Sequence, residues 1–196
     1  PILEHFLPGN RLALFLDRMI LEQTAALRLL CDQAQARNVP LHITAFLRYC
    51  AELLAVETTR PHTVIAAASG DPAGYGADLL DLIDELMGDP PVSVVNSGNA
   101  GCDILRIGYP EERYALLQLF HRRKTPMIVT ALGEGWSRTL TLDGSQNHRA
   151  AYLQFQAFLR ALETRAPPVP YARVLAHAAI LQAAQRKAFG TEIIVR

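Results

Sequence analysis

The sequence has little that would direct the protein to a membrane or to a charged polymer. No apolar run approaches the roughly 18 residues of a membrane span. The first residues, Pro1 to His5, lack the basic stretch and following apolar stretch of a signal peptide. The 19 Lys and Arg balance the 19 Asp and Glu, so no net field attracts nucleic acid or anionic lipid. We therefore expect a cytoplasmic protein with no membrane or nucleic-acid partner, which binds a small-molecule ligand or another protein.

Cysteine is also scarce, and the histidines are scattered. The three cysteines, Cys31, Cys50 and Cys102, are odd in number and show no C-x-x-C spacing, so we expect buried, reduced thiols. The six histidines show no spacing of metal ligands, so we expect no bound metal. His177 lies in a predicted helix, where a packed or surface histidine is expected rather than a catalytic one. The basic cluster His121–Lys124 is interpreted as a solvated hairpin tip.

The N-terminal part of the chain alternates between predicted strands and a helix. Half of the 196 residues are apolar, enough for one sizeable core. Short apolar runs predict strands at Arg11–Leu16 and Pro40–Ala45, and apolar residues at helical spacing predict a helix from Ile20 to Arg37. This βαβ order is typical of a parallel sheet, and it resembles the end of a larger α/β domain.

The rest of the chain is richer in strands, at a spacing typical of an antiparallel meander. The predicted strands are His62–Ala68, Val92–Asn96, Asp103–Tyr109, Arg113–His121, Met127–Leu132, Arg138–Leu142 and Glu192–Val195. Helices are predicted at Leu47–Ala55 and Ala77–Met87, followed by two near the C-terminus. Tyr152, Phe155, Leu159 and Leu162 line one face of the first of these two, and Val174, Ala178 and Leu181 line the second.

Several short motifs, in a consistent order, carry a family resemblance. Asp17-Arg18-Met19 is similar to a Glu-Lys-Pro strand end, and the register continues without gaps to Arg37-Asn38-Val39-Pro40-Leu41. Arg48-Tyr49 resembles an Arg-Phe/Tyr helix start, and Gly76-Ala77-Asp78 resembles a Gly-x-His helix that closes on glycine. Tyr171 to Gly190 resembles a C-terminal Ala-rich helix. Together they resemble the glucose-fructose oxidoreductase, inositol dehydrogenase and rhizopine-catabolism family.

This resemblance implies a fold and a division into domains. Residues 1–45 would be the end of a Rossmann nucleotide-binding domain, and residues 46–196 a substrate-binding and oligomerisation domain. The second part would be α+β, with a mixed, largely antiparallel open sheet and helices on one face, similar to the C-terminal domain of dihydrodipicolinate reductase. No Gly-x-Gly-x-x-Gly turn is present, and Gly133-Glu134-Gly135 is interpreted as a hairpin or bulge. NAD or NADP is implied, but this chain alone is not expected to bind it.

The family's catalytic positions are changed in this sequence. The lysine and histidine that handle the hydroxyl proton correspond to Arg18 and Asp78, and an aspartate before the histidine corresponds to Gly74. A guanidinium with a pKa above about 12 cannot exchange a proton near neutral pH, so Arg18 could only hold or polarise a substrate. Asp78 could act as a base only if strongly desolvated, because its reference pKa is about 3.9.

Other site residues follow from the same resemblance, and each has a plainer interpretation. The resemblance implies substrate contacts for Arg48, Tyr49, Tyr75 and Asp81, and cofactor contacts for Asp17 and Arg18. Asp78 and Asp81 could instead cap a helix start. Arg18 could form a structural ion pair across a cleft, and Arg48 with Tyr49 could be a surface pair that packs a helix end.

Three functions therefore remain open. The chain could be part of an NAD(P)-dependent oxidoreductase acting on a sugar, cyclitol or related hydroxyl or carbonyl compound, inactive without a nucleotide-binding domain that a separate polypeptide could supply. It could be a catalytically dead module that binds a ligand or dimerises, because alternating strands such as 114–120 offer an apolar sheet face. A weaker alternative is a cofactor-independent lyase or isomerase with Asp78 as base.

Overall fold

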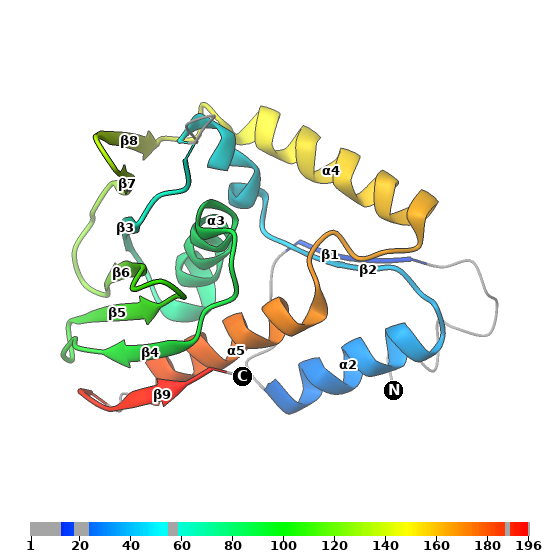
Figure 1. Cartoon of the computed structure of the whole chain (residues 1–196), viewed down its shortest axis with the longest axis horizontal. Coiled ribbons are helices and arrows are strands. Elements are labelled where there is room, and N and C mark those ends of the chain that lie inside the picture. Colours follow the sequence, from blue (N-terminus) through cyan, green and yellow to red (C-terminus); the bar gives the residue numbers. More distant parts are fainter. Residues whose placement is uncertain (1–12, 18–23, 55–58, 187–188, 196) are drawn as a thin grey trace.

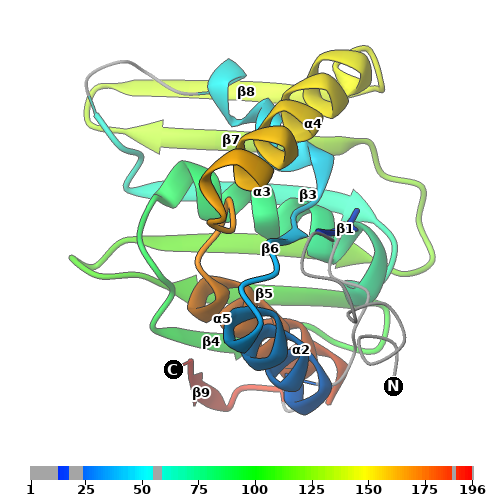
Figure 2. The same cartoon turned by 90° about the vertical axis from the view of Figure 1, so that its right-hand side faces the viewer.

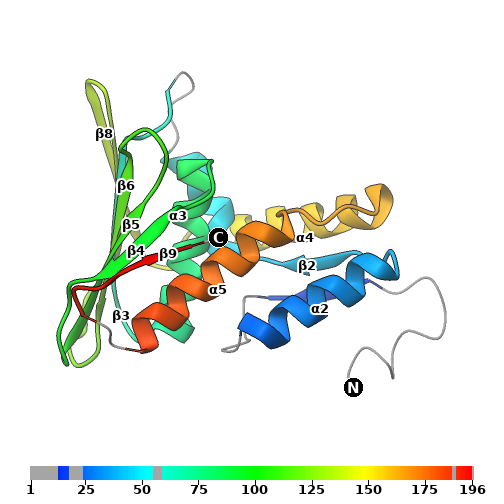
Figure 3. The ribbon, with the colours of Figure 1, turned by 60° about the horizontal axis from the view of Figure 1, so that its bottom comes forward.

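The computed structural model describes residues 13–17, 24–54, 59–186 and 189–195. Figure 1 shows the helices grouped beside a large sheet, and Figure 3 shows that they all lie on one side of it. The predicted α+β class, with an open sheet and helices on one face, is confirmed.

The predicted βαβ unit is present in the described part of the chain. It consists of β1 (Leu14–Leu16), α2 (Thr24–Ala36) and β2 (Leu41–Ile43). The strands are parallel, with Leu14 opposite Leu41. Leucine and isoleucine side chains of both strands pack in one apolar cluster with α2 and with Val174 of a C-terminal helix. Alternation along the strands sends Phe15 and His42 to the opposite face.

The large sheet has seven strands in the order β8-β7-β3-β6-β5-β4-β9. Their bounds are β3 Thr63–Ser69, β4 Ser93–Asn96, β5 Cys102–Gly108, β6 Tyr114–Phe120, β7 Met127–Gly133, β8 Trp136–Leu142 and β9 Glu192–Ile194. In the described part of this sheet β3 and β6 are parallel and the other neighbouring strands are antiparallel, so the predicted mixed, largely antiparallel sheet is confirmed. A simple meander is wrong, because β3 lies between β6 and β7.

This strand order contradicts the hairpin tip predicted at His121–Lys124 and agrees with the hairpin predicted at Gly133-Glu134-Gly135. His121–Lys124 is not a hairpin tip, because β6 and β7 are not neighbours and the connection between them crosses the end of β3. His121 Nε2 lies 2.7 Å from Asp103 Oδ2, on the neighbouring strand β5. Gly133 to Trp136 does form a hairpin between β7 and β8, and Gly135 has the positive φ of 74° that favours glycine.

Besides α2, the described residues form five further helical segments. They are η1 (Phe46–Leu53), η2 (Pro72–Gly76), α3 (Ala77–Met87), α4 (Asn147–Thr164) and α5 (Tyr171–Gln185). The helix predicted at Leu47–Ala55 is a 3₁₀ helix over the described residues. Helix α3 has the predicted bounds and ends at Gly88, whose φ of 74° gives the left-handed cap. It is the central helix, because the apolar side chains on all its faces are buried.

The apolar residues predicted to line one face of α4 are largely exposed. Tyr152, Phe155 and Leu159 are 61, 54 and 43% exposed, whereas Ala150, Gln154 and Ala161 are buried. Small residues therefore let α4 lie close to the protein, while Tyr152, Phe155 and Leu159 face outward. Figure 2 shows α4 crossing in front of the sheet.

Candidate functional site

The segment before α3 is an irregular turn on which several predicted site residues lie. Asp71 accepts a hydrogen bond from the Gly74 amide at 2.7 Å, which closes the turn. Gly76 packs closely, because a Cβ there would lie 2.9 Å from Cδ1 of Leu119, which would have to move. Tyr75 is 51% exposed, and Asp78 in the first turn of α3 is 1% exposed. The segment thus combines an exposed phenol with a buried carboxylate.

The plainer role suggested for Asp78 was that of a helix cap. Gly76 holds the N-cap position of α3, and glycine has no side chain that could form a cap hydrogen bond. Asp71 provides the side-chain hydrogen bond of this turn instead. Asp78 lies in the first turn of α3, where the helix dipole favours a negative charge.

Further along α3, three carboxylates converge on one arginine of η1. Nη1 of Arg48 donates to Oδ1 of Asp81 at 2.9 Å and to Oδ2 of Asp84 at 2.8 Å. Its Nη2 donates to Glu85. Arg48 is buried, so the suggestion that it belongs to a surface pair is wrong. Asp81 also accepts from the amide of Ala45 at 2.6 Å, which ties the end of β2 to α3.

Helix α5 adds two more groups to this cluster. Nε of Arg173 donates to Oδ1 of Asp84 at 2.9 Å, and its Nη2 donates to the Asp84 carbonyl at 2.8 Å. His177 is packed, as predicted, and its Nε2 lies 3.1 Å from Oδ1 of Asp84. We call Arg48, Asp81, Asp84, Glu85, Arg173 and His177 the α3 charge cluster.

The pKa values of this cluster follow from burial and from its opposite charges. Burial alone would raise the pKa of Asp84, but His177 and Arg48 outweigh it and hold that pKa below its ordinary value. Burial raises the pKa of Asp81, and Arg48 and His177 only partly offset this effect. Burial would lower the pKa of Arg48, yet Asp81, Glu85 and Asp84 raise it above its ordinary value. The cluster therefore keeps Arg48 charged and pairs it with carboxylates.

Other predicted residues lie apart from this cluster or outside the described residues. Asp17, at the end of β1, is exposed and accepts a hydrogen bond from Nε2 of Gln154 at 3.1 Å. The same Nε2 donates to the Thr44 carbonyl at 2.6 Å, so α4 is tied to both strands of the βαβ unit. Tyr49 is half-buried, and its hydroxyl lies 3.4 Å from Oγ1 of Thr44. Arg18 lies outside the described residues.

Sequence reasoning missed Asp84 and Arg173 and assigned His177 only a packing role. A local signal was available, because Asp81 and Asp84 stand three residues apart and so lie on one side of the predicted helix. Arg173 and His177 stand four residues apart and so share a helix face. Nothing in the sequence pairs these two faces, because α3 and α5 are separated by more than 80 residues.

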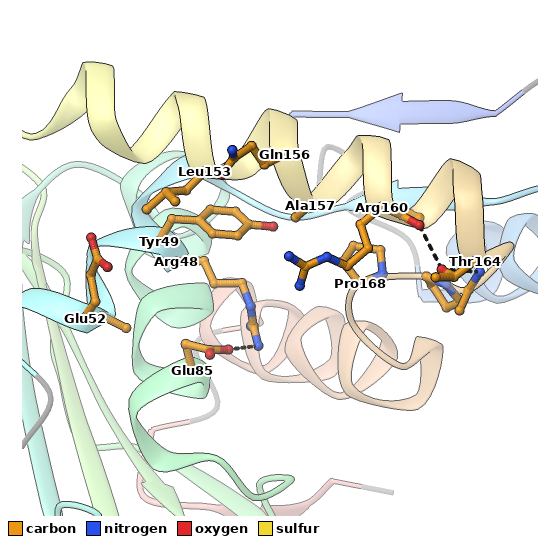
Figure 4. A pocket seen from close by; sticks show the side chains of 14 residues that line it. Arg48, Tyr49, Glu52, Glu85, Leu153, Gln156, Ala157, Arg160, Thr164 and Pro168 are labelled. Atoms are coloured by element: carbon orange, nitrogen blue, oxygen red, sulfur yellow. Dashed lines mark hydrogen bonds and ion pairs between the residues drawn. The ribbon is translucent and has the colours of Figure 1, made fainter. Parts of the chain in front are cut away.

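Space near the cluster is limited. A cavity of about 10 Å³ lies between β2, α3 and α5, and it holds at most one water molecule. A larger pocket of about 460 Å³ lies between η1, α3 and α4 (Figure 4).

Among the described residues, no three histidine, cysteine or acidic side chains are grouped as metal ligands. No helix in the described ranges is long and apolar enough to span a bilayer.

No protein-family model and no curated protein sequence matches the chain. Its fold is nevertheless that of sugar and cyclitol dehydrogenases. GenD2 from gentamicin A biosynthesis, solved in complex with NAD, matches with a TM-score of 0.74 and 14% identity, over 100% of this chain and 75% of that one. Myo-inositol 2-dehydrogenase from Lactobacillus plantarum matches with a TM-score of 0.66 and 12% identity, over 89% of this chain and 70% of that one.

A third similar structure is scyllo-inositol dehydrogenase from Lactobacillus casei with bound NAD(H) and scyllo-inositol. It matches with a TM-score of 0.62 and 11% identity, over 88% of this chain and 70% of that one. At these identities the similarity establishes a common fold. The resemblance to the glucose-fructose oxidoreductase, inositol dehydrogenase and rhizopine-catabolism family is thereby confirmed for the fold.

Proposed function

We propose that this chain is the substrate-binding and oligomerising part of an NAD(P)-dependent oxidoreductase that acts on a sugar, cyclitol or related compound. On this proposal it is inactive without a nucleotide-binding domain. The observation that carries the proposal is the small parallel sheet, in which β1 has no neighbour other than β2 among the described residues. Parallel sheets normally have more strands and are covered on both faces. The outer edge of β1 is thus suited to receive further parallel strands.

Exposed aromatic residues next to this edge of β1 also support the proposal that a nucleotide-binding domain docks there. Phe15 of β1 is 39% exposed and packs edge-on against Phe158 of α4, with ring centroids 5.2 Å apart. Phe158 in turn contacts Phe155, which continues into the exposed stripe of α4. Additional strands beside β1 would cover this continuous apolar surface. We propose that residues 1–45 belong to such a nucleotide-binding domain, with 46–196 forming the substrate domain.

The proposed substrate cleft lies at the start of α3. Tyr75 and Asp78 would face the substrate, with Gly74 leaving room beside them and Arg18 holding the substrate and the cofactor together with Asp17. Asp78 would act as the base, since its burial excludes water from around it. Arg48 and Asp81 would support the site by fixing α3, because both are engaged in the charge cluster.

We propose that the open face of the large sheet forms a homodimer. Apolar residues such as Ile104, Leu116 and Ile128 alternate with the buried residues of their strands and lie on the face away from the helices. Covering this face by a second copy would bury them.

The test is a titration with NADH and NADPH, followed by nicotinamide fluorescence, of this chain and of any longer product that its gene encodes. We expect micromolar binding by the longer form and none by this chain. Asp78→Asn in the longer form should reduce turnover of polyols and leave NADH binding unchanged. Absence of binding by any form, including a mixture with separate nucleotide-binding domains, would reject the redox proposal.

A second function is a ligand-binding or dimerising module without redox chemistry. It is favoured by Arg18 and Gly74, which stand where the family has a proton-transferring lysine and an aspartate. Failure of cofactor binding together with a stable dimer would support this module. Turnover of a substrate without cofactor would instead support a lyase or isomerase.

A further inference from the structure

The pocket between η1 and α4 lies outside the proposed cleft. Its walls come from η1, the end of α3, the C-terminal half of α4 and the connection to α5 (Figure 4). Glu85 at the pocket is seven residues beyond Asp78 on α3, or roughly 10 Å along the axis at 1.5 Å per residue. A molecule in this pocket would therefore not occupy the cleft. The volume of about 460 Å³ is within the range of small-molecule sites.

The pocket has an apolar wall and a polar rim. Leu153, Ala157 and Ala161 of α4 form one side, and Pro167 and Pro168 of the α4–α5 connection close one end. Such a wall favours an aliphatic or aromatic body in the ligand.

The charges around the pocket leave one cation without a counter-charge. Arg48 is bound by Asp81, Asp84 and Glu85. Oε1 of Glu52 lies 2.7 Å from Nε of Arg149. Arg160 is exposed, and within the described ranges no carboxylate lies at ion-pair distance from its guanidinium.

The orientation of Arg160 places this cation over the pocket. Its side chain reaches from α4 toward Arg48 and Tyr49 (Figure 4). A guanidinium binds a carboxylate through two parallel hydrogen bonds, with a geometry that few other groups match. Glu52 and Glu85 on the rim would repel a second negative charge on the ligand. The pocket is thus suited to one negative charge near Arg160.

We propose that this pocket binds a small monocarboxylic acid, with its carboxylate on Arg160 and its apolar body against Leu153, Ala157 and the two prolines. This site is separate from the proposed oxidoreductase function and does not depend on it. Occupation would bring a ligand next to Arg48, which joins the pocket to the α3 charge cluster.

The proposal is tested by titrating the full chain with sodium benzoate and sodium hexanoate, following backbone amide shifts by NMR. Benzamide and hexanamide serve as neutral controls of the same shape. We expect saturable shifts in α4 and η1 with a Kd below about 1 mM for at least one acid, and binding of its amide weaker by about tenfold or more.

Two variants locate the site. Arg160→Gln removes an exposed charge without disturbing the core and should weaken acid binding by about tenfold or more, whereas Arg123→Gln on the exposed β6–β7 connection should not change it. Ala157→Trp should block binding by filling the pocket, with an unchanged unfolding midpoint in urea showing that the fold is intact. The proposal is overturned if neither acid saturates by about 10 mM, or if Arg160→Gln leaves the Kd unchanged.

Discussion

Two regions of this molecule bury polar side chains in different ways. The α3 charge cluster places Asp84, which is fully buried, between the guanidinium groups of Arg48 and Arg173. The βαβ unit instead buries His42 against the ring of Phe15, with centroids 4.8 Å apart. Its Nε2 lies 2.6 Å from the Thr44 hydroxyl.

The difference shows what each region requires for stability. The cluster keeps its charges because α3 supplies carboxylates and because η1 and α5 supply the arginines that pair with them. Ionic hydrogen bonds thus hold the three elements together. In the βαβ unit, burial lowers the pKa of His42 to about 4, although Asp17 partly opposes this. His42 is therefore neutral at pH 7, and aromatic packing holds it in place.

The most severe test of the comparison is to remove the arginine at the centre of the cluster. Arg48→Met keeps an unbranched side chain of similar length but leaves the buried carboxylate of Asp81 without its arginine, while Asp84 keeps only Arg173 and His177. Removing one partner from a buried ion pair costs about 3–5 kcal/mol, and we expect a loss of this size in the free energy of unfolding. Urea denaturation at pH 7.5 measures it.

Arg60 provides a matched control outside the core. Its Nη1 lies 3.0 Å from Oδ2 of Asp89, but its side chain is 62% exposed. Exposed ion pairs contribute below about 1 kcal/mol, so Arg60→Met should have little effect. Equal losses in the two variants would show that burial does not distinguish the two ion pairs.

The histidine of the βαβ unit gives a pH-dependent test. The pKa of His42 is about 4 in the folded protein and 6.5 ordinarily, so between these values the unfolded chain binds more protons. Its contribution to stability is therefore present above pH 6.5 and is lost as the pH falls toward 4. The full loss is on the order of 3 kcal/mol.

The variant that removes this titration is His42→Phe, which preserves an aromatic ring beside Phe15. We expect the unfolding free energy of the wild-type protein to fall relative to this variant between pH 7.5 and pH 4, by about 3 kcal/mol. His148→Gln, on the exposed start of α4, should follow the wild-type curve. Parallel curves for the wild-type protein and His42→Phe would contradict the assignment of the pKa shift to His42.

The sequence predicted the individual helices and strands better than it predicted which of them lie side by side. Helix α3 has the expected bounds because it lies between Gly76 and Gly88, both of which mark helix ends. The position of β3 between β6 and β7 could not be predicted, because strand pairing over such sequence distances leaves no local pattern. The apolar stripe of α4 has helical spacing, but spacing alone does not determine whether a helix turns that stripe toward its own core or outward.

The α3 charge cluster was predicted only in part, because it too depends on contacts between elements that are distant in the sequence. Arg48 and Asp81 were selected by resemblance, and the structure brings them into contact. Asp84 and Arg173 were missed, because their importance arises only when α3 and α5 pack together. Short motifs identify residues on one helix or strand, whereas this buried charge cluster is formed by residues of three elements, η1, α3 and α5.

A smaller effect is expected beside the cluster, at the buried hydroxyl of Tyr109. Tyr109 is 4% exposed, and its hydroxyl has no hydrogen-bond partner within the described part of the chain. Burial raises its pKa well above the ordinary value, and the nearby Asp84 adds to this effect. An unpaired buried hydroxyl costs about 1–3 kcal/mol, so Tyr109→Phe should leave the protein as stable or raise the free energy of unfolding by about 1 kcal/mol.

Urea denaturation at pH 7.5 measures this gain, and Tyr114→Phe on the half-buried face of β6 is the matched control. A clear loss of stability in Tyr109→Phe alone would show that the hydroxyl has a partner, such as an ordered water molecule bridging it to Asp84. The cluster would then extend to the turn after β5, and the contrast with the βαβ unit would become stronger, because this buried hydroxyl would also be held by a hydrogen bond.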